Sequence, residues 1–178
     1  MEDQRIRMTK KCLKEALIQL LKEKELSKIS VRELCSRACI NRTTFYKYYE
    51  MPGDVLADIA KNFQDDIRNF FSENPVEEGK HLTAFLQYQL DNKETALLLL
   101  THHYSASGDL PLLDTLGMDN FLRKDCRGDN ALYEYASLYY SAGCSAIIEN
   151  WLKKETPEPA AYMASVILAM TNFRGLEP

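Results

Sequence analysis

The chain has 178 residues, of which 46% are hydrophobic and 27% charged, and it carries a formal net charge of −4. No apolar run approaches the roughly 20 residues that a membrane span needs, and the charged start Met1 to Arg7 does not resemble a secretory signal, so we expect a cytoplasmic protein without a membrane segment. Five scattered cysteines, an odd number, are not typical of a disulfide framework, and we expect reduced thiols.

Helical periodicity dominates the chain, and no segment alternates apolar and polar residues as a half-buried strand would, so the predicted fold is all-α. The first helix is expected over residues 4–24 because one apolar stripe runs along it: Leu13, Ala16, Leu17, Leu20 and Leu21. Ser30, with Glu33 at the capping-box position, predicts a second helix from Val31. The residues expected on its buried face are Val31, Leu34, Cys35 and Ala38.

A third helix is expected from Arg42 to about Tyr49, capped by Asn41. Pro52 and Gly53 then interrupt the pattern, and a longer amphipathic helix should follow and end near Glu73. Its expected inward residues are Val55, Leu56, Ile59, Phe63, Ile67, Phe70 and Phe71. Further helices are expected over 79–91, 93–106, 111–126, 129–154 and 157–173, with Thr156 as the cap and Pro157 as the first residue of the last one.

The basic charge is concentrated in the N-terminal segment. Residues 1–50 hold twelve Lys or Arg against seven Asp or Glu, a balance of +5, whereas the remaining 128 residues hold ten against nineteen, a balance of −9. A basic head on an acidic body suits an anionic partner such as duplex DNA.

Two short helices joined by a tight turn indicate a helix-turn-helix, whose second helix enters the major groove by its N-terminal turns. If Ile40, Phe45 and Tyr49 are buried, the opposite face presents Arg42, Thr43, Tyr46 and Lys47. Arg42, Thr43 and Thr44 would lie nearest the base edges, while Tyr46 and Lys47 would reach phosphates. A helical hairpin with a solvated polar face is the alternative; the order of capped helix, tight turn, capped helix and aromatic pair favours DNA binding.

Over residues 8–58 the chain resembles the TetR-type transcriptional regulators. The matching positions are Val31 to Leu34, Ala38, Thr44 to Tyr46, Tyr49 where the family usually has Phe, and Val55 with Leu56. The resemblance implies a helix-turn-helix DNA-binding domain at residues 1–51 and a helical regulatory and dimerisation domain at 52–178. It also implies a homodimer on a palindromic operator and, often, a small-molecule effector. Carried over by position, it places Ser30 near a phosphate and puts the following residues at DNA-facing positions: Asn41, Arg42, Thr43, Thr44, Tyr46 and Lys47.

Two residues depart from the family pattern. Cys39 stands where the turn usually has Gly, so this turn must accept a side chain. Pro52 stands where a Lys that contacts phosphate is common, which removes one electrostatic contact in each head and should weaken binding and its salt dependence.

The C-terminal part resembles a subset of the family that includes regulators of the dihydroxyacetone kinase type. The resemblance rests on Tyr139 to Cys144, Ile147 with Ile148, Trp151 with Leu152, and Thr156 with Pro157. It implies dimerisation through the last two helices, and small residues such as Ala142 and Gly143 would let another helix approach closely. The same small residues could equally mark a contact within one chain.

Three classes of function were weighed. We expect a DNA-binding repressor whose binding a small molecule would relieve; the second interpretation is a coactivator of the same fold that acts through a partner regulatory protein. An enzyme is disfavoured because no catalytic motif stands out, and we expect no cofactor. His102 and His103 are not expected to bind a metal, since adjacent helical residues diverge by about 100°. The aromatic residues of the body could line an effector pocket or form ordinary core.

Overall fold

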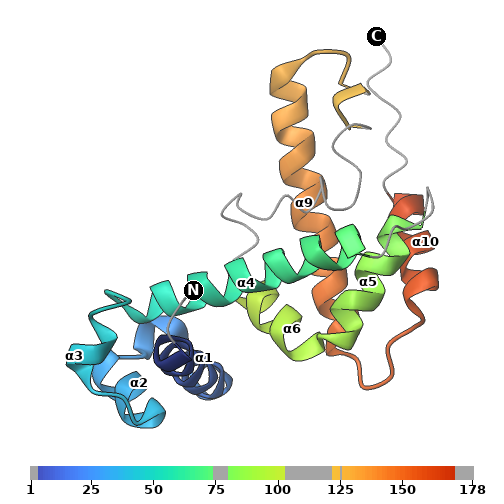
Figure 1. Cartoon of the computed structure of the whole chain (residues 1–178). Coiled ribbons are helices and arrows are strands. Elements are labelled where there is room, and N and C mark those ends of the chain that lie inside the picture. Colours follow the sequence, from blue (N-terminus) through green and yellow to red (C-terminus); the bar gives the residue numbers. More distant parts are fainter. Residues whose placement is uncertain (1–3, 74–79, 103–121, 125, 171–178) are drawn as a thin grey trace. The chain divides into compact units, whose positions relative to one another are not determined.

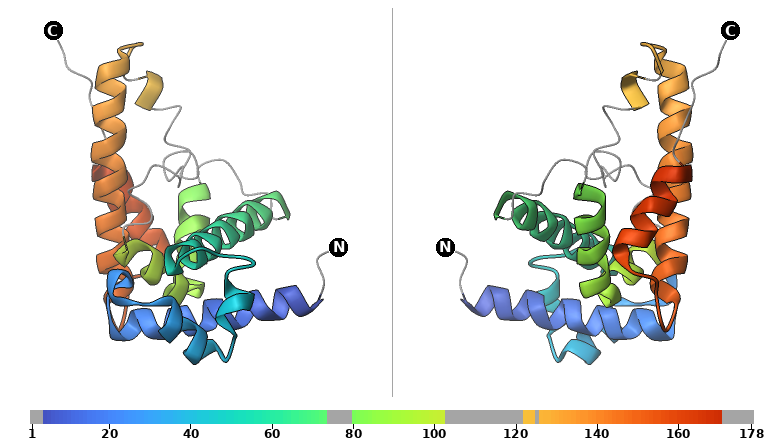
Figure 2. Two further views of the ribbon diagram at one scale, coloured as in Figure 1. Left: turned by 90° about the vertical axis from the view of Figure 1, so that its left-hand side faces the viewer. Right: turned by 90° about the vertical axis from the view of Figure 1, so that its right-hand side faces the viewer.

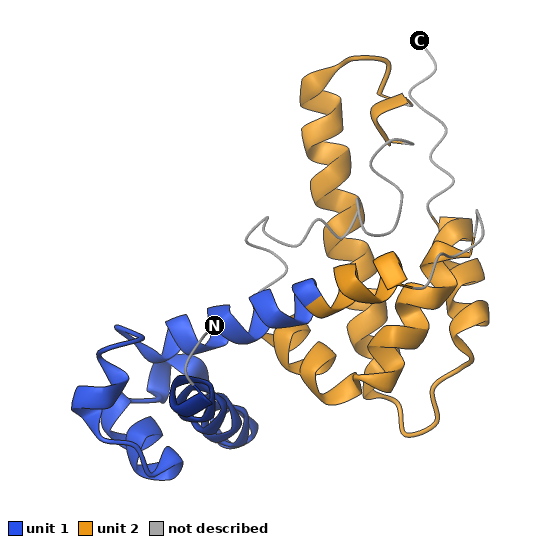
Figure 3. Ribbon diagram, viewed as in Figure 1, with its two compact units in different colours: residues 1–65 blue, residues 66–178 orange. Residues whose placement is uncertain are grey.

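The computed structural model describes residues 4–73, 80–102, 122–124 and 126–170, and helices are the secondary-structure elements in these ranges (Figure 1). The prediction of an all-α fold is thereby confirmed. The chain forms two compact units, residues 1–65 and 66–178, and the boundary between them in the sequence falls within one long helix (Figure 3). Within the described ranges, no helix has the length and apolar character needed to cross a membrane.

Unit 1 is a small helical head. It comprises α1 (Gln4–Glu23), the 3₁₀ helix η1 (Leu26–Lys28), α2 (Val31–Ala38), α3 (Arg42–Phe45) and most of α4 (Pro52–Glu73). The stripe predicted for the first helix is buried in full, as expected. It faces a core to which α2, α3 and α4 contribute Leu34, Phe45, Val55 and Leu56, each at most 1% exposed.

The two ends of α2 explain its length. At its start, the Ser30 hydroxyl oxygen accepts a hydrogen bond from the Glu33 backbone N–H at 3.2 Å, which is the predicted N-cap. At its end, Cys39 adopts the left-handed conformation, with φ 55° and ψ 35°. Cys39 N–H donates to the Ser36 carbonyl and Ile40 N–H to the Cys35 carbonyl, the paired bonds of a Schellman motif.

The two cysteines of this segment have different environments. Cys35 is buried, as predicted, and burial raises the pKa of its thiol. Cys39, in contrast, is exposed, because the left-handed cap turns the chain away from the helix.

The third helix is shorter than predicted. α3 ends at Phe45, and residues 46–48 form turns rather than a continuing helix up to Tyr49. Lys47 N–H and Tyr48 N–H donate to carbonyls three residues earlier, which tightens the chain. The sequence accounts for this, because threonines and aromatic residues have modest helix propensity and fill most of residues 43–49.

Unit 2 contains the end of α4, α5 (His81–Asp91), α6 (Lys93–Thr101), α9 (Asn130–Lys153) and α10 (Ala160–Met170). α5 packs on α10, and α6 packs on both α5 and α9. The largest core side chains are Trp151 and Phe85, each 1% exposed. The N-terminal half of α9 extends beyond α10 (Figure 2). The helix predicted at 111–126 lies mostly outside the described residues.

The predicted start of the last helix is wrong. Thr156 and Pro157 precede α10, which begins at Ala160. Pro159 disfavours a helical conformation at Glu158, which favours a helix that begins after that proline. The Trp151 indole N–H donates to the Glu158 carbonyl at 2.9 Å and holds the connection in this turn.

Cys39 provides a test of local strain. Because a non-glycine residue in the left-handed region costs about 1 to 2 kcal/mol, Cys39→Gly should stabilise the protein by about 0.5 to 1 kcal/mol after the greater flexibility of unfolded glycine is subtracted. Chemical denaturation of the full chain measures this. Cys39→Ala is the control, since it removes the thiol but keeps Cβ; equal stability of the two variants would contradict the strain argument.

Candidate nucleic-acid interface

The side chains of the segment around α3 fall into two groups, one in the core of the head and one on the surface of the head. Phe45 is completely buried and Tyr49 is 7% exposed. The residues of the opposite face are exposed, except for the half-buried Thr44: Asn41, Arg42, Thr43, Tyr46 and Lys47. Tyr46 is 60% exposed although it is aromatic. Six of the seven residues expected to face DNA therefore occur together on the segment from Asn41 to Lys47.

Ser30, the seventh, and Asn41 each cap a helix while they remain exposed. Asn41 Oδ1 accepts from Thr43 N–H at 2.9 Å, and the Ser30 hydroxyl accepts from Glu33 N–H. Both caps use an acceptor, because helix N-termini present N–H groups. The hydroxyl hydrogen of Ser30 and the amide hydrogens of Asn41 therefore remain available as donors, which are what phosphate oxygens require.

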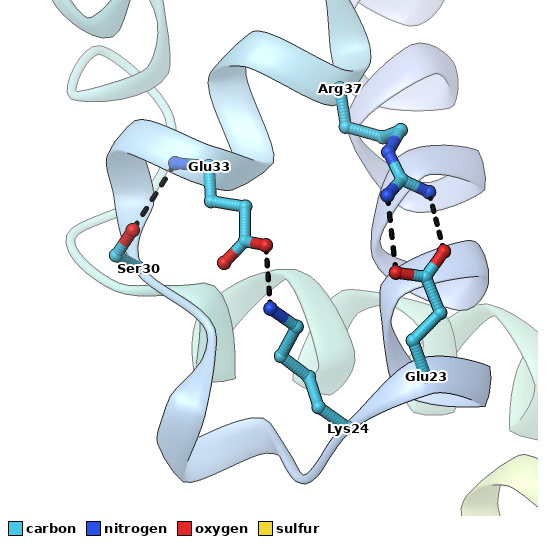
Figure 4. Close-up of polar contacts among 5 residues, drawn as sticks. All are labelled: Glu23, Lys24, Ser30, Glu33 and Arg37. Atoms are coloured by element: carbon cyan, nitrogen blue, oxygen red, sulfur yellow. Dashed lines mark hydrogen bonds and ion pairs between the residues drawn. The ribbon is translucent and has the colours of Figure 1, made fainter.

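Two ion pairs connect α2 to the last residue of α1 and to the residue that follows it (Figure 4). Lys24 Nζ donates to Glu33 Oε1 at 2.6 Å, so the Glu33 carboxylate does not complete a reciprocal capping box. Arg37 forms two hydrogen bonds with Glu23 of α1, at 2.9 and 3.2 Å. The hydrogen bonds from Arg37 hold the pKa of the Glu23 carboxyl below its usual range. Because Lys24 and Arg37 are paired, their charges are largely compensated at short range.

Arg42 and Lys47, in contrast, form no ion pair with the described residues. Their charges lie on an exposed surface together with hydroxyl and amide donors. A surface with two uncompensated cations and several donors is suited to a polyanion. Within the same described part of the chain, no group of three His, Cys, Asp or Glu could hold a metal ion.

A polar cluster around Asp58, in the same unit, was not predicted from the sequence. Tyr49 Oη donates to Asp58 Oδ2 at 2.6 Å, and Lys14 Nζ lies 3.1 Å from the same oxygen. Burial raises the pKa of the Asp58 carboxyl, but the Tyr49 hydroxyl and the ammonium groups of Lys14 and Lys10 outweigh it, so the pKa lies below its ordinary value. The signal that could have indicated the cluster is Tyr49, whose hydroxyl needs a partner once the ring is buried.

The chain is similar to known transcriptional regulators. Residues 79–173, more than half of the chain, match a family model described as a transcriptional regulator C-terminal region. A 55-residue stretch, 31% of the chain, is 29% identical to a Bacillus subtilis (strain 168) protein named as the uncharacterized HTH-type transcriptional regulator YxbF. The match covers 14% of the length of that relative.

The depressed pKa of Asp58 predicts acid sensitivity. The ionised carboxylate stabilises the folded head at pH values above its unfolded pKa of about 3.9, and this contribution is lost as the pH falls through the lower folded value. Asp58→Asn should therefore lower the melting temperature at pH 7, with a smaller difference from the wild type near pH 3. Glu50→Gln, at an exposed position, is the charge-matched control. A difference that is the same at both pH values would contradict the assignment.

Proposed function

The chain belongs to the TetR-type transcriptional regulators, a family of regulators and not of enzymes, and on this premise we propose that it is a repressor that binds a palindromic operator as a homodimer. The resemblance predicted from residues 8–58 is confirmed at the level of the family. The observation that carries the proposal is the division of side chains around α3, where Phe45 and Tyr49 are buried and the cationic and donor groups are exposed.

Each exposed residue has a role that follows from its chemistry. Arg42, in the first turn of α3, would read a guanine edge with two hydrogen bonds, and Thr43 and Thr44 would contact neighbouring bases. Tyr46 and Lys47 would bind phosphates, as would the hydroxyl of Ser30 and the amide of Asn41. We assign these functions to a domain of residues 1–51, with regulation and dimerisation in residues 52–178. A small effector would act on the second domain.

Pro52 limits the electrostatic contribution. It is the first residue of α4. Proline is well tolerated there because a backbone N–H at this position would have no carbonyl acceptor within the helix. The carboxylate of Asp54 accepts from Glu50 N–H and Met51 N–H, which fixes the turn before the helix. The residues at the start of α4 therefore stabilise the turn but do not place a cation at position 52. We expect fewer phosphate contacts than a Lys at this position would give.

The homodimer is supported by an apolar surface on α9 and α10. Large side chains are exposed at positions that recur with helical spacing along α9, and more are exposed on α10: Tyr135, Leu138, Tyr139, Tyr162, Leu168 and Met170. Four of them, Tyr135, Leu138, Tyr139 and Met170, line a groove of about 590 Å³ together with residues that include Ala142, Gly143 and Ile167. A contiguous exposed apolar surface of this kind is typical of an interface.

Gly143 adds an independent argument for close approach by a second copy. It lies inside α9, where glycine costs roughly 0.5 to 1 kcal/mol relative to alanine. A Cβ atom placed there would meet no atom within 4 Å, so packing within the chain does not require glycine. A partner helix that crosses at Gly143 would require it, and the two-fold symmetry of such a dimer would match the symmetry of a palindromic operator.

Selection of binding sites from random duplex DNA tests the proposed function. The wild type should enrich a palindrome, and both Arg42→Ala and Tyr46→Ala should weaken its binding about tenfold or more, because each removes a direct contact. Lys61→Ala, which removes one exposed charge of α4 outside the interface, should change binding by less than about threefold. No enrichment at low salt would contradict direct DNA recognition and favour a coactivator that acts through a partner protein.

Gly143→Ala tests the dimer. The added methyl should raise the dissociation constant of the dimer about tenfold or more by overpacking the crossing, yet stabilise the isolated chain through better helix propensity. Analytical ultracentrifugation and denaturation measure the two effects. Gly53→Ala, where the added Cβ has ordinary contacts in unit 1, should leave dimerisation unchanged. Unaltered association of Gly143→Ala would contradict this crossing point.

A further inference from the structure

We propose that Asp58 is a positioning residue for the DNA-binding face, because its carboxylate joins the segment that follows α3 to both α4 and α1. This inference rests on the proposed function, and it adds a residue that does not itself reach the DNA. All of the groups concerned lie in unit 1, so the argument depends on the geometry of the head alone.

The link consists of short contacts between three elements. Asp58, on α4, accepts the Tyr49 hydroxyl at 2.6 Å and pairs with Lys14 of α1 at 3.1 Å through the same oxygen, Oδ2. The side chains of Lys14 and Asp58 are only 17% and 24% exposed. The Tyr49 ring in turn contacts Phe45, with ring centroids 5.8 Å apart. A continuous path of contacts thus runs from α4 through Tyr49 to α3.

Asn62 holds the cluster together one turn further along α4. In the amide orientation that satisfies both of its ends, Asn62 Oδ1 accepts from Lys14 Nζ at 2.5 Å, and its nitrogen donates to the Asp58 backbone carbonyl at 3.2 Å. Lys14 is therefore held by two acceptors on α4. The carboxylate that receives the Tyr49 hydroxyl is itself held in place, so the bond can transmit an orientation.

The reason that α3 needs such a link is its length. A helix of four residues forms barely one turn, and a single turn has no stability of its own because nucleation is unfavourable. Burial of Phe45 keeps α3 on the head, but apolar burial is not directional. A hydrogen bond to a charged acceptor is both strong and directional. Burial of Phe45 therefore determines how closely α3 packs against the core of the head. The Tyr49–Asp58 bond determines the rotation of α3 about its own axis, and this rotation sets the direction of the Arg42 and Thr43 side chains.

Tyr49→Phe is the minimal test, since it removes one hydroxyl and keeps the buried ring. Tyr48→Phe is the matched control, because Tyr48 is half-buried next to it and the cluster does not include it. Asp58→Asn with Glu50→Gln as its charge-matched control forms a second pair. Each full-length variant is examined by amide hydrogen exchange without DNA and by binding to the selected palindrome and to an unrelated duplex.

We expect Tyr49→Phe to speed exchange at the amides of residues 45–49 at least about fivefold relative to those of α1, and to weaken palindrome binding about tenfold while unrelated duplex changes less than about twofold. A purely structural role would raise exchange throughout the head and leave the preference of the folded protein for its site intact. That result, or wild-type exchange and binding in Tyr49→Phe, would overturn the inference.

Different results would contradict the proposed function and the positioning role of Asp58. If the wild type itself does not prefer any duplex, the proposed function is wrong, and the exchange rates of residues 45–49 alone then decide whether Asp58 positions this segment. If the wild type binds its palindrome and Tyr49→Phe matches it while folded, the positioning role is wrong and the proposed function stands.

Discussion

The orientation of a one-turn helix depends on contacts made by its neighbours, and the DNA-binding face of this protein depends on that orientation. α3 is capped by Asn41, anchored by Phe45 and followed by Tyr49, whose hydroxyl is bound to Asp58. The turn that precedes it is set by Cys39 in the left-handed conformation. Because these contacts do not use the side chains of Arg42, Thr43, Tyr46 and Lys47, those side chains remain available to a partner.

The cationic side chains of the head also fall into two groups, one that stabilises the fold and one that is exposed. Lys14, Lys24 and Arg37 have carboxylate partners and serve the fold, whereas Arg42 and Lys47 have no ion pair among the described residues and serve the proposed interface. Half-buried pairs such as Lys14–Asp58 depend little on salt, while exposed cations opposite phosphates depend on it strongly. High salt should therefore release DNA long before it unfolds the head.

The helices and their buried faces were predicted from the sequence more successfully than the residues at which the helices begin and end. The buried stripe of α1 and the caps Ser30 and Asn41 follow from local periodicity and side-chain chemistry, and the structure confirms them. The end of α3 and the start of α10 were predicted wrongly, because the low helix propensity of residues 43–49 and the proline at Pro159 outweigh the periodic pattern. The Asp58 cluster joins residues from three helices, and no local pattern indicates such a contact. The DNA-facing roles stay predictions.

The central claim is that the exposed face of α3 binds DNA directly, and the salt dependence of binding tests it most directly. Binding of the selected palindrome by the wild type and by Lys47→Ala is measured over a range of salt concentrations. The account predicts a steep loss of affinity with salt in the wild type and a slope smaller by about one charge per head in Lys47→Ala, with similar weakening on every duplex. A slope that is unchanged by Lys47→Ala would contradict the assignment of this face to the DNA backbone.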